Sequence, residues 1–259
     1  MPTQSDLKKR RAGQAAFSYV RDTILPQVDG SNLWLGVGSG TTVRFFVDEL
    51  GRALQEDSFG ALVQAIPTSL DTEEHLRHWG IPARSLEDLP PTEWLPVYVD
   101  GADEVDHNGR ALKGLGGALA REKWVRLVAR EFLLVVDDGK VVDTLGGHNS
   151  PVVCEVVPFG VARTIHRLLT SDPKPTKAVL RHGSGKLGPV VTDNGNLLLD
   201  LYYEPAVLGE SDLESLEGQL RTVPGVVETG LFALTGASRS FVGTVDGVVQ
   251  LDYRRLEEI

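Results

Sequence analysis

The stretch "LWLGVGSGTT", residues 33–42, joins a short apolar run to a turn rich in glycine and hydroxyl side chains. An amphipathic segment, residues 41–56, follows directly, so the pattern predicts a buried strand, a tight turn and the start of a helix. Free amide groups and the helix dipole favour an anion at such a helix start, and hydroxyl groups add donors. The alternative is an ordinary glycine turn in which a threonine caps the helix.

The same loop does not fit the known nucleotide-binding patterns. The dinucleotide pattern G-x-G-x-x-G needs a third glycine for close helix packing, and Thr41 stands in its place after Gly36 and Gly38. A Walker loop needs lysine before its hydroxyl residue, and this loop has none. A single phosphate therefore fits the loop better than a nucleotide does.

Strand and helix patterns alternate along the chain up to about residue 145. Continuous apolar runs predict buried strands, and the segments between them have helical spacing, which favours an α/β domain with a parallel sheet and helices on both faces. The predicted helices include residues 5–24, capped by Ser5 or Asp6, and residues 71–81, with Asp71 and Glu74 as a capping box. The predicted strands are 33–37, 61–66, 95–100 and 132–138, and the remaining helices are 41–56 and 118–132.

The pattern changes near residues 146–151. A strand at 152–157 and a helix at 159–169 precede a hairpin at 189–203, for which Asn194 and Gly195 form a two-residue turn. A helix over 211–223, capped by Ser211, completes a β-α-β-β-α order that is typical of a small α+β (ferredoxin-like) domain. We expect the tail, residues 230–252, to return to the first domain as edge strands. The predicted domains are 1–145 plus 227–259, and 146–226.

Composition narrows the class of protein. The 259 residues carry a formal net charge of −10, which argues against nucleic-acid binding because that needs a basic patch. The single cysteine, Cys154, allows no intramolecular disulfide. No signal peptide and no membrane-spanning stretch is predicted. These features predict a soluble cytoplasmic protein with no nucleic-acid or membrane partner.

A second polar segment, "VYVDGADEVDHNG", covers residues 97–109. Asp100 ends a predicted strand, where open α/β sheets place ligand sites, and Asp103 and Glu104 follow. The spacing does not match a calcium loop, and the isolated His107 and His148 suggest no metal site. Carboxylates without a metal suit acid catalysis and recognition of sugar hydroxyls, although a solvated acidic turn is the alternative.

Three further charged residues follow short apolar or glycine-rich runs. Lys113 precedes a glycine cluster, where backbone can approach a ligand closely. Glu122 lies on a largely apolar helix face, and partial desolvation would make it a stronger base. The alternative is an exposed Glu122–Arg126 ion pair. Lys140 comes just after a predicted strand and alone would be a surface lysine.

Together these residues give the chain a resemblance to ribose-5-phosphate isomerase, type A. The acidic turn, the lysine-glycine run and "REK" in this order are highly specific. The matching stretches are "DLKK", "GVGSGTT", "PTS", "DGADE", "KGLGGALAREK", "VVDDGK", "VVTDNGNLLLD", "PGVVETGLFA" and "GTVDGVV".

The resemblance implies an aldose–ketose isomerase of the pentose phosphate pathway. It would interconvert D-ribose 5-phosphate and D-ribulose 5-phosphate, with no metal and no cofactor. The fold implied is a Rossmann-like parallel sheet domain with a smaller α+β domain that carries oligomer contacts. A homodimer or homotetramer is also implied.

The resemblance also implies roles for individual residues. Glu122 matches the catalytic base, Asp100 and Asp103 match the acidic pair that contacts the sugar, and Lys113 matches the lysine beside the reacting oxygens. Lys140 and, less directly, Lys8 match phosphate or substrate contacts. The other implied substrate-binding residues are Ser39, Gly40, Thr41, Thr42, Gly101, Ala102, Gly114, Leu115 and Gly116.

Two departures stand out. The family run has lysine and three glycines, whereas Leu115 interrupts it here. Ser39 stands where threonine is more common, which keeps the hydroxyl. Two other functions remain open from the sequence: a different phosphosugar enzyme on a similar scaffold, and a non-catalytic sugar-phosphate sensor.

Overall fold

The computed structural model describes residues 3–28, 32–183, 185 and 187–253. The chain divides into two compact units. The first contains Met1–Ala102, Trp124–Val141 and Ala237–Ile259, and the second contains Asp103–Lys123 and Val142–Gly236. No described helix combines the length and the apolar character needed to cross a membrane.

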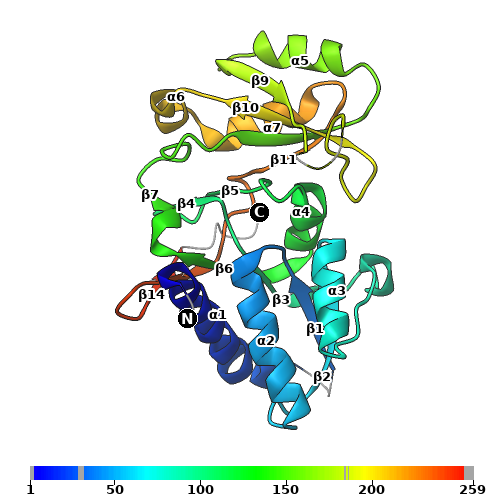
Figure 1. Ribbon diagram of the computed structural model, residues 1–259, viewed down its shortest axis with the longest axis vertical. Coiled ribbons are helices and arrows are strands. Elements are labelled where there is room, and N and C mark those ends of the chain that lie inside the picture. The colour runs from blue at the N-terminus through cyan, green and yellow to red at the C-terminus, as the bar shows by residue number, and fades with distance from the viewer. Residues whose placement is uncertain (1–2, 29–31, 184, 186, 254–259) are drawn as a thin grey trace. The chain divides into compact units, whose positions relative to one another are not determined.

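Nine of the described helices and strands lie wholly in the first unit, and Figure 1 labels most of them. They are α1 (Gln4–Tyr19), β1 (Asn32–Val37), α2 (Thr41–Gln55), β2 (Leu62–Pro67), α3 (Leu70–His78), β3 (Leu95–Asp100), β6 (Ala129–Asp137), β13 (Arg239–Gly243) and β14 (Val248–Asp252). Short helical turns cover Val20–Ile24, Leu25–Gln27, Leu86–Asp88 and Asp138–Lys140.

The second unit holds the remaining elements. They are β4 (Glu104–Asp106), β5 (Ala111–Leu112), β8 (Val152–Val156), α5 (Val161–Leu169), β9 (Lys177–Leu180), β10 (Leu197–Tyr202), α6 (Pro205–Glu210), α7 (Leu213–Thr222), β11 (Val226–Thr229) and β12 (Leu231–Phe232). Two elements contain residues of both units: α4 (Leu119–Leu127) and β7 (Val141–Val142).

The sheet of the first unit confirms the predicted parallel architecture. Among the described residues its strand order is β14-β13-β6-β3-β1-β2, and only β14 runs antiparallel to its neighbour. The chain passes from β1 outward to β2 and then returns to the other side of β1 for β3. This reversal is a topological switch point, and ligands of open α/β sheets bind at the carboxyl ends of the strands there. The glycine loop follows β1, and Asp100 ends β3.

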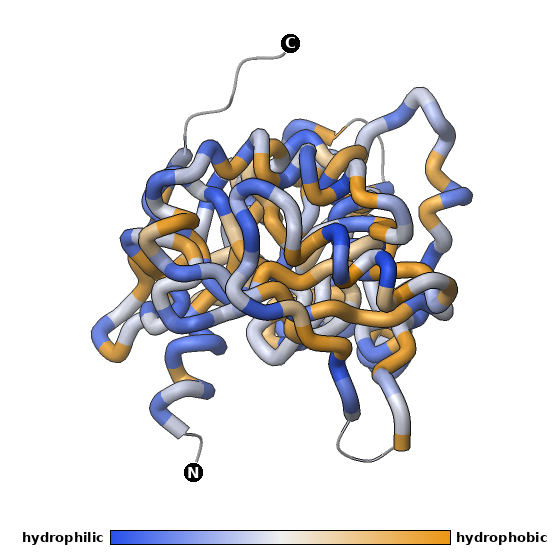
Figure 2. Tube along the Cα trace, turned by 90° about the horizontal axis from the view of Figure 1, so that it is seen from above, coloured by the Kyte–Doolittle hydropathy of each residue, from blue (hydrophilic) through white to orange (hydrophobic). Residues whose placement is uncertain are grey.

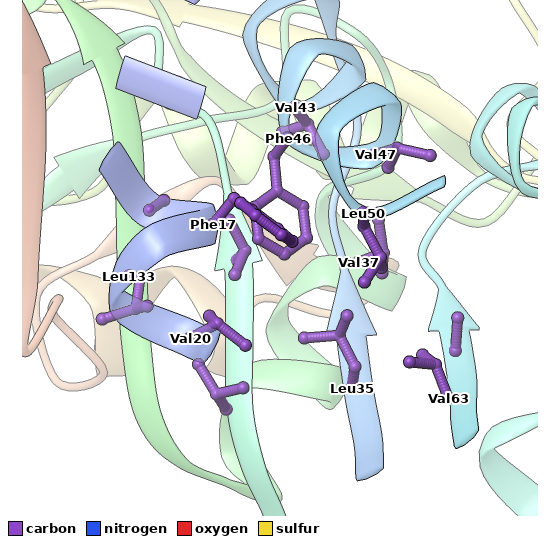
Figure 3. Close-up of a cluster of buried hydrophobic side chains, with 14 of the residues drawn as sticks. Phe17, Val20, Leu35, Val37, Val43, Phe46, Val47, Leu50, Val63 and Leu133 are labelled. Atoms are coloured by element: carbon purple, nitrogen blue, oxygen red, sulfur yellow. The ribbon is translucent and has the colours of Figure 1, made fainter. Parts of the chain in front are cut away.

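Side chains alternate between the two faces of this sheet, as the pleat of a strand requires. On one face, Leu35 and Val37 of β1 pack with Phe17 of α1 and Phe46 of α2 in a buried apolar cluster (Figure 3). Figure 2 shows hydrophobic and hydrophilic stretches following one another along the Cα trace. On the other face, Gly36 leaves no room for a Cβ, which would lie 2.6 Å from Val125 of α4. Helices therefore cover both faces, as predicted.

The second unit has the predicted small α+β fold. Its main sheet has the order β11-β8-β10-β9, and every adjacent pair is antiparallel. In chain order this is the 4-1-3-2 arrangement of a β-α-β-β-α-β unit. Leu168 of α5 and Leu216 of α7 pack with Cys154 and Leu199 on one face of the sheet. A second small sheet has the order β12-β5-β4-β7.

The predicted helix caps were wrong by one to three residues. Thr3 caps α1 and forms a capping box with Asp6, so neither Ser5 nor Asp6 is the cap. Ser69, not Asp71, caps α3 by accepting a hydrogen bond from the Thr72 amide. Asp212, not Ser211, caps α7. The candidate caps lie close together in sequence, and backbone conformation decides which one is used.

Two predicted segments were also wrong in detail. The helix expected at 118–132 ends at Leu127, and the strand begins at Ala129, so the apolar residues beyond 128 belong to β6. The hairpin turn has three residues rather than two, because Thr192 pairs with Asn196 and the Gly195 amide donates to the Thr192 carbonyl. Gly195 has a φ of 81°, which suits the last position of such a turn.

The domain boundaries differ from the predicted ones. Residues 103–123, 142–145 and 227–236, assigned to the first domain from the sequence, belong to the second unit. The reason is strand pairing, since β5 pairs antiparallel with both β4 and β12. The tail returns to the first unit as predicted, although β13 lies inside the sheet and only β14 is an edge strand. The ends of the predicted first domain, residues 1–2 and 254–259, lie outside the described residues.

Candidate active site

The glycine loop of the first unit is held directly against Asp100. The Gly38 amide donates to the Val99 carbonyl at 2.8 Å, and the Ser39 amide donates to Oδ1 of Asp100 at 3.0 Å. A Cβ added to Gly38 would lie 1.9 Å from the Asp100 carboxyl group. Only glycine fits this contact, so the loop and the carboxylate at the ends of β1 and β3 form one packed group.

Hydroxyl side chains from a neighbouring strand end support the loop. The Oγ of Ser39 lies 3.0 Å from the hydroxyl of Thr68 and donates to the hydroxyl of Ser69 at 2.8 Å. Thr72 in turn donates to the Gly38 carbonyl at 2.7 Å. Thr68, Ser69 and Thr72 are buried and were not predicted as site residues, although "PTS" had matched the family. Their role as supports depends on tertiary packing that the sequence pattern does not reveal.

The loop ends at a helix start, as predicted. Gly40 is the N-terminal cap of α2 and makes no side-chain cap, so the alternative of a threonine cap is wrong. Thr41 and Thr42 are the first two residues of the helix, and Thr41 is exposed. The helix start therefore carries exposed hydroxyl groups beside amides at the positive end of the helix dipole.

Asp100 is fully buried and well supplied with donors. The Gly101 amide donates to its Oδ1 at 2.7 Å, and the Tyr98 hydroxyl donates to its Oδ2. The Tyr98 ring stacks on Phe132 of the neighbouring strand, with ring centroids 4.9 Å apart. Tyr98 was missed from the sequence, although a residue two positions before Asp100 on a strand must share its face. These donors fix the orientation of the carboxylate.

The two lysines predicted as phosphate contacts lie on segments that meet. Lys8 of α1 donates to Asp138 at 2.6 Å, and Asp138 and Lys140 share the short helical turn after β6. Asp138 is exposed and Lys8 is partly exposed. The first helix therefore brings one positive charge to the turn that carries the other.

In the second unit, Lys113 and Glu122 form a buried ion pair. The Nζ of Lys113 lies 3.3 Å from Oε2 of Glu122, and the two side chains are 3% and 6% exposed. The alternative of an exposed Glu122–Arg126 pair is wrong, because Glu122 is buried and Arg126 donates to the Ala129 carbonyl at 3.0 Å. The pair therefore holds a cation and a carboxylate together where little water reaches either of them.

The glycine run after Lys113 is a compact turn. Its Leu115 amide donates to Oδ2 of Asp103 at 2.9 Å, and its Gly117 amide donates to the Gly114 carbonyl at 3.0 Å. Gly114 and Gly117 have positive φ angles, whereas Leu115 does not. Leu115 is also 49% exposed. The unusual leucine therefore occupies a position with an ordinary φ angle and a half-exposed side chain.

Two neighbours of the predicted site residues have structural contacts. Glu104 is buried and accepts hydrogen bonds from the amides of Gly146 and His148, at 2.6 and 3.1 Å. Lys123 donates to Glu217 at 2.5 Å and to the Leu231 carbonyl at 2.5 Å. Burial lowers the pKa of Lys123, and the neighbouring Glu217 opposes that shift. Both contacts anchor the segments that carry Asp103 and Glu122.

Arg181 is the residue that sequence reasoning missed entirely. It follows β9 and forms hydrogen bonds with both oxygens of Asp200 on β10. Its Nη1 also donates to the carbonyls of Gly114 and Leu115, at 2.9 and 3.0 Å. No local signal marks this arginine, because its partners are 66 and 67 residues away in the chain.

Within the part of the chain that the structure describes, no group of three or more His, Cys, Asp or Glu side chains is placed to hold a metal ion. His107 pairs with Asp143 at 3.1 Å and is exposed. His148 is also exposed and lies 4.0 Å from the carboxylate of Glu104.

Comparison with known proteins gives this arrangement a family. Residues 64–247 match the family model of ribose 5-phosphate isomerase A (phosphoriboisomerase A), which is well over half of the chain. The chain belongs to the ribose 5-phosphate isomerase A family. The resemblance seen in the sequence is thereby confirmed.

Relatives of this family match the chain over nearly its full length. A ribose-5-phosphate isomerase A of Legionella pneumophila is 40% identical over 246 residues, covering 94% of this chain and 98% of the relative. One of Methanococcus maripaludis is 37% identical over 234 residues, covering 90% and 88%. A solved D-ribose-5-phosphate isomerase in complex with phospho-erythronic acid has a TM-score of 0.82 at 33% identity, covering 96% of this chain and all of that one. The fold of the ribose 5-phosphate isomerase A family is therefore the fold of this chain.

Proposed function

We propose that the protein interconverts D-ribose 5-phosphate and D-ribulose 5-phosphate through a cis-enediol(ate), as an enzyme of the non-oxidative pentose phosphate pathway. The buried Lys113–Glu122 pair carries this proposal, because it joins a base to a cation in a site shielded from water. Family membership supports it, as does the relative that binds phospho-erythronic acid. That ligand has a carboxylate, whose two oxygens share a negative charge as the two oxygens of an enediolate do.

Glu122 is the proposed base. Isomerisation of an aldose removes the proton from C2, next to the aldehyde carbon, and returns a proton to C1. One carboxylate on one face of the substrate performs both transfers. The Glu122 side chain is buried, so few water molecules can compete with the substrate for its carboxylate.

Lys113 is the proposed electrostatic partner of the developing charge. Negative charge appears on the substrate oxygens as the C2 proton leaves, and a preorganised cation stabilises it most where water is excluded. Lys113 is 3% exposed. The residues of the glycine run, Gly114, Leu115 and Gly116, are proposed to contact the same substrate.

The two aspartates take different roles in this proposal. Asp100 assists ring opening and moves the proton between O1 and O2, with Gly101 and Ala102 of the same turn contacting the substrate. Asp103 binds sugar hydroxyls, since carboxylates are strong acceptors of hydrogen bonds. The hydrogen bonds from Tyr98 and Ser39 to Asp100 support its role, because a proton-transfer group must be held in one orientation.

The phosphate is assigned to the first unit. Ser39, Gly40, Thr41 and Thr42 offer hydroxyls and amides at the start of α2, and such helix starts bind anions. Lys140 and Lys8 add positive charge. An incoming phosphate would compete with Asp138 for the ammonium group of Lys8.

The test is proton NMR of ribose 5-phosphate in D₂O with metal-stripped enzyme and a chelator. Formation of ribulose 5-phosphate, with deuterium entering at C1, is the expected result. Direct return of the abstracted proton would lower the amount of label without stopping turnover. Conversion of a different phosphosugar instead, or binding without turnover, would contradict the proposal. Loss of turnover with the chelator would point to a metal.

Assembly and location belong to the same proposal. We expect a homodimer or homotetramer in the cytoplasm, with oligomer contacts on the smaller domain and a phosphosugar as the only small-molecule partner. Light scattering after size-exclusion chromatography measures the mass of the particle, and a 28.1 kDa monomer would contradict the expected assembly.

A further inference from the structure

The guanidinium group of Arg181 holds two parts of the second unit at once. Its Nε donates to both oxygens of Asp200, at 3.0 and 3.1 Å, while its Nη1 donates to the carbonyls of Gly114 and Leu115. The side chain is 15% exposed and that of Asp200 is 13% exposed. A largely buried arginine in a fork against a carboxylate has a fixed direction, so it is a rigid donor to the two carbonyls.

The backbone of Arg181 is also held in place by hydrogen bonds. The Arg181 amide donates to the Leu198 carbonyl at 2.9 Å, and its carbonyl accepts from Val190 at 2.9 Å. The glycine run packs on the same sheet, because a Cβ at Gly114 would lie 3.0 Å from Val153 and one at Gly117 would lie 3.2 Å from Leu198. Val153 and Leu198 are fully buried. The run thus lies on β8 and β10, with Arg181 beside it.

The planarity of the peptide bond carries this constraint to the amide groups. In a trans peptide the C=O and the following N–H lie in one plane and point in opposite directions. The peptide between Gly114 and Leu115 is held at both ends, by Arg181 at its carbonyl and by Asp103 at its N–H. The peptide between Leu115 and Gly116 is held by Arg181 at its carbonyl. The N–H of this second peptide belongs to Gly116 and therefore points away from the guanidinium. The Leu115 N–H likewise points away from the guanidinium, towards Asp103.

Gly116 is placed to use that direction. The residue is exposed, and a Cβ added to it would meet no atom within 4 Å. We infer that Arg181 is a positioning residue that aims the Gly116 N–H at the oxygens of the enediolate. This inference rests on the proposed isomerase function, and it assigns a residue of the small sheet to the stabilisation of the reacting atoms.

The kinetic test is Arg181→Lys, with Arg167→Lys on the exposed side of α5 as the matched control. Lysine keeps the charge but has no planar fork, so it cannot hold Asp200 and both carbonyls together. Loss of one oxyanion donor typically lowers turnover by roughly 10²–10³-fold. We expect kcat to fall by roughly 10-fold to 10²-fold with KM changed less than about twofold, because the donor acts mainly in the transition state.

A binding measurement separates positioning from a general effect on folding. Isothermal titration with phospho-erythronic acid, whose carboxylate is charged, is compared with ribitol 5-phosphate, which has the phosphate and hydroxyls but no carboxylate. The expected result is weaker binding of the acid by the same factor as kcat, with unchanged binding of the polyol. Guanidinium ion added to Arg181→Ala is expected to restore part of kcat.

Equal kcat in Arg181→Lys and Arg167→Lys would overturn the inference, and so would equal weakening of both ligands. If Arg181→Lys does not fold, Asp200→Asn decides by the same criteria, because it keeps the shape of the side chain and loosens the guanidinium. Wild-type protein that neither isomerises ribose 5-phosphate nor binds phospho-erythronic acid would instead show that the proposed function itself is wrong.

Discussion

The ammonium group of Lys113 lies 3.3 Å from the carboxylate of Glu122, and both side chains are shielded from water. Glu122 comes nine positions after Lys113 in the chain and lies in the first turn of α4, whereas Lys113 follows β5. Attraction between the charges offsets the cost of burying each of them. The pair keeps a charged base in a site that would otherwise favour its neutral form.

Replacing Glu122 by glutamine should abolish catalysis and spare binding. The amide has nearly the same shape but cannot take the C2 proton, and a positioned base typically contributes about 10²–10⁴ to the rate. We expect kcat to fall by that factor, while the affinity for ribitol 5-phosphate in titration stays within about threefold. Glu214→Gln, at an exposed position of α7, is the control. A nearly active Glu122→Gln enzyme would remove Glu122 from the mechanism.

The Lys113–Glu122 ion pair should also affect the free energy of unfolding. Lys113→Met leaves a buried carboxylate without its cation, which costs about 3 kcal/mol in comparable pairs. Lys113→Met combined with Glu122→Gln removes both charges, so the double variant should be more stable than Lys113→Met alone. Urea unfolding followed by circular dichroism measures the free energies of unfolding of the wild type, the two single variants and the double variant. Additive losses in the double variant would mean that the two side chains are not coupled.

The contact between Gly38 and Asp100 should make Gly38→Ala damaging. The new Cβ would overlap the carboxyl group, and overpacking of this kind costs about 1–3 kcal/mol. We expect lower stability together with a large loss of kcat, because Asp100 must move. Gly218→Ala is the matched substitution, since Gly218 lies inside α7 with no atom within 4 Å of the added Cβ. It should raise stability by about 0.5–1 kcal/mol and leave activity unchanged.

A Gly38→Ala enzyme with normal kcat would show that the loop can shift without disturbing Asp100. A crystal structure of that variant would then reveal where the carboxylate has gone. Destabilisation by Gly218→Ala would mean that this part of α7 is more crowded than the structure indicates.

Cys154 should be unreactive in the folded protein. It is fully buried on β8, and burial raises the pKa of its thiol from 9.0 to about 12. The thiolate is the reactive form, so a disulfide reagent at pH 8 should modify less than about a tenth of the native protein and all of the protein unfolded in guanidinium. Rapid modification of the native protein would show that β8 opens readily.

The raised pKa of the Cys154 thiol also predicts that the protein becomes less stable as the pH rises above 9. Above pH 9 the unfolded chain loses the thiol proton, while the folded chain keeps it until about pH 12. The contribution of Cys154 to the free energy of unfolding should therefore be complete below pH 9. Above pH 9 that contribution should fall by about 1.4 kcal/mol per pH unit. Cys154→Ala lacks this contribution, so the difference in slope between the two proteins isolates it. Equal slopes would contradict the raised pKa.

Patterns that depend on neighbours in sequence predicted most of the fold. The apolar runs at 33–37, 95–100 and 152–157 became β1, β3 and β8, because a strand buried on both faces must be apolar throughout. The caps and the end of α4 were misplaced because several residues close in sequence could serve equally well. The sequence could not reveal that residues 103–123 join the second unit, because pairing of β5 with β12 links positions about 120 residues apart.

The residues of the candidate site likewise fall into those that a local sequence pattern marks and those that depend on distant contacts. Gly38, Asp100, Lys113 and Glu122 could be found because each sits beside a strand end or a glycine run that leaves a mark in the sequence. Tyr98 needed the knowledge that alternate strand residues share a face. Arg181 could not be found, because its importance comes from hydrogen bonds to carbonyls of distant residues, and any residue type can supply a backbone carbonyl.

The position of β13 has a consequence for how the chain is made. This strand, residues 239–243, lies between β6 and β14, so the first sheet is incomplete until residues 239–252 have been synthesised. Residues 142–236 leave the ribosome earlier and contain all four strands of the antiparallel β8–β11 sheet. Residues 142–236 can therefore fold before β13 has been synthesised. During that time the sheet formed by β1, β2, β3 and β6 has an open edge at β6, where chaperones or other nascent chains can bind.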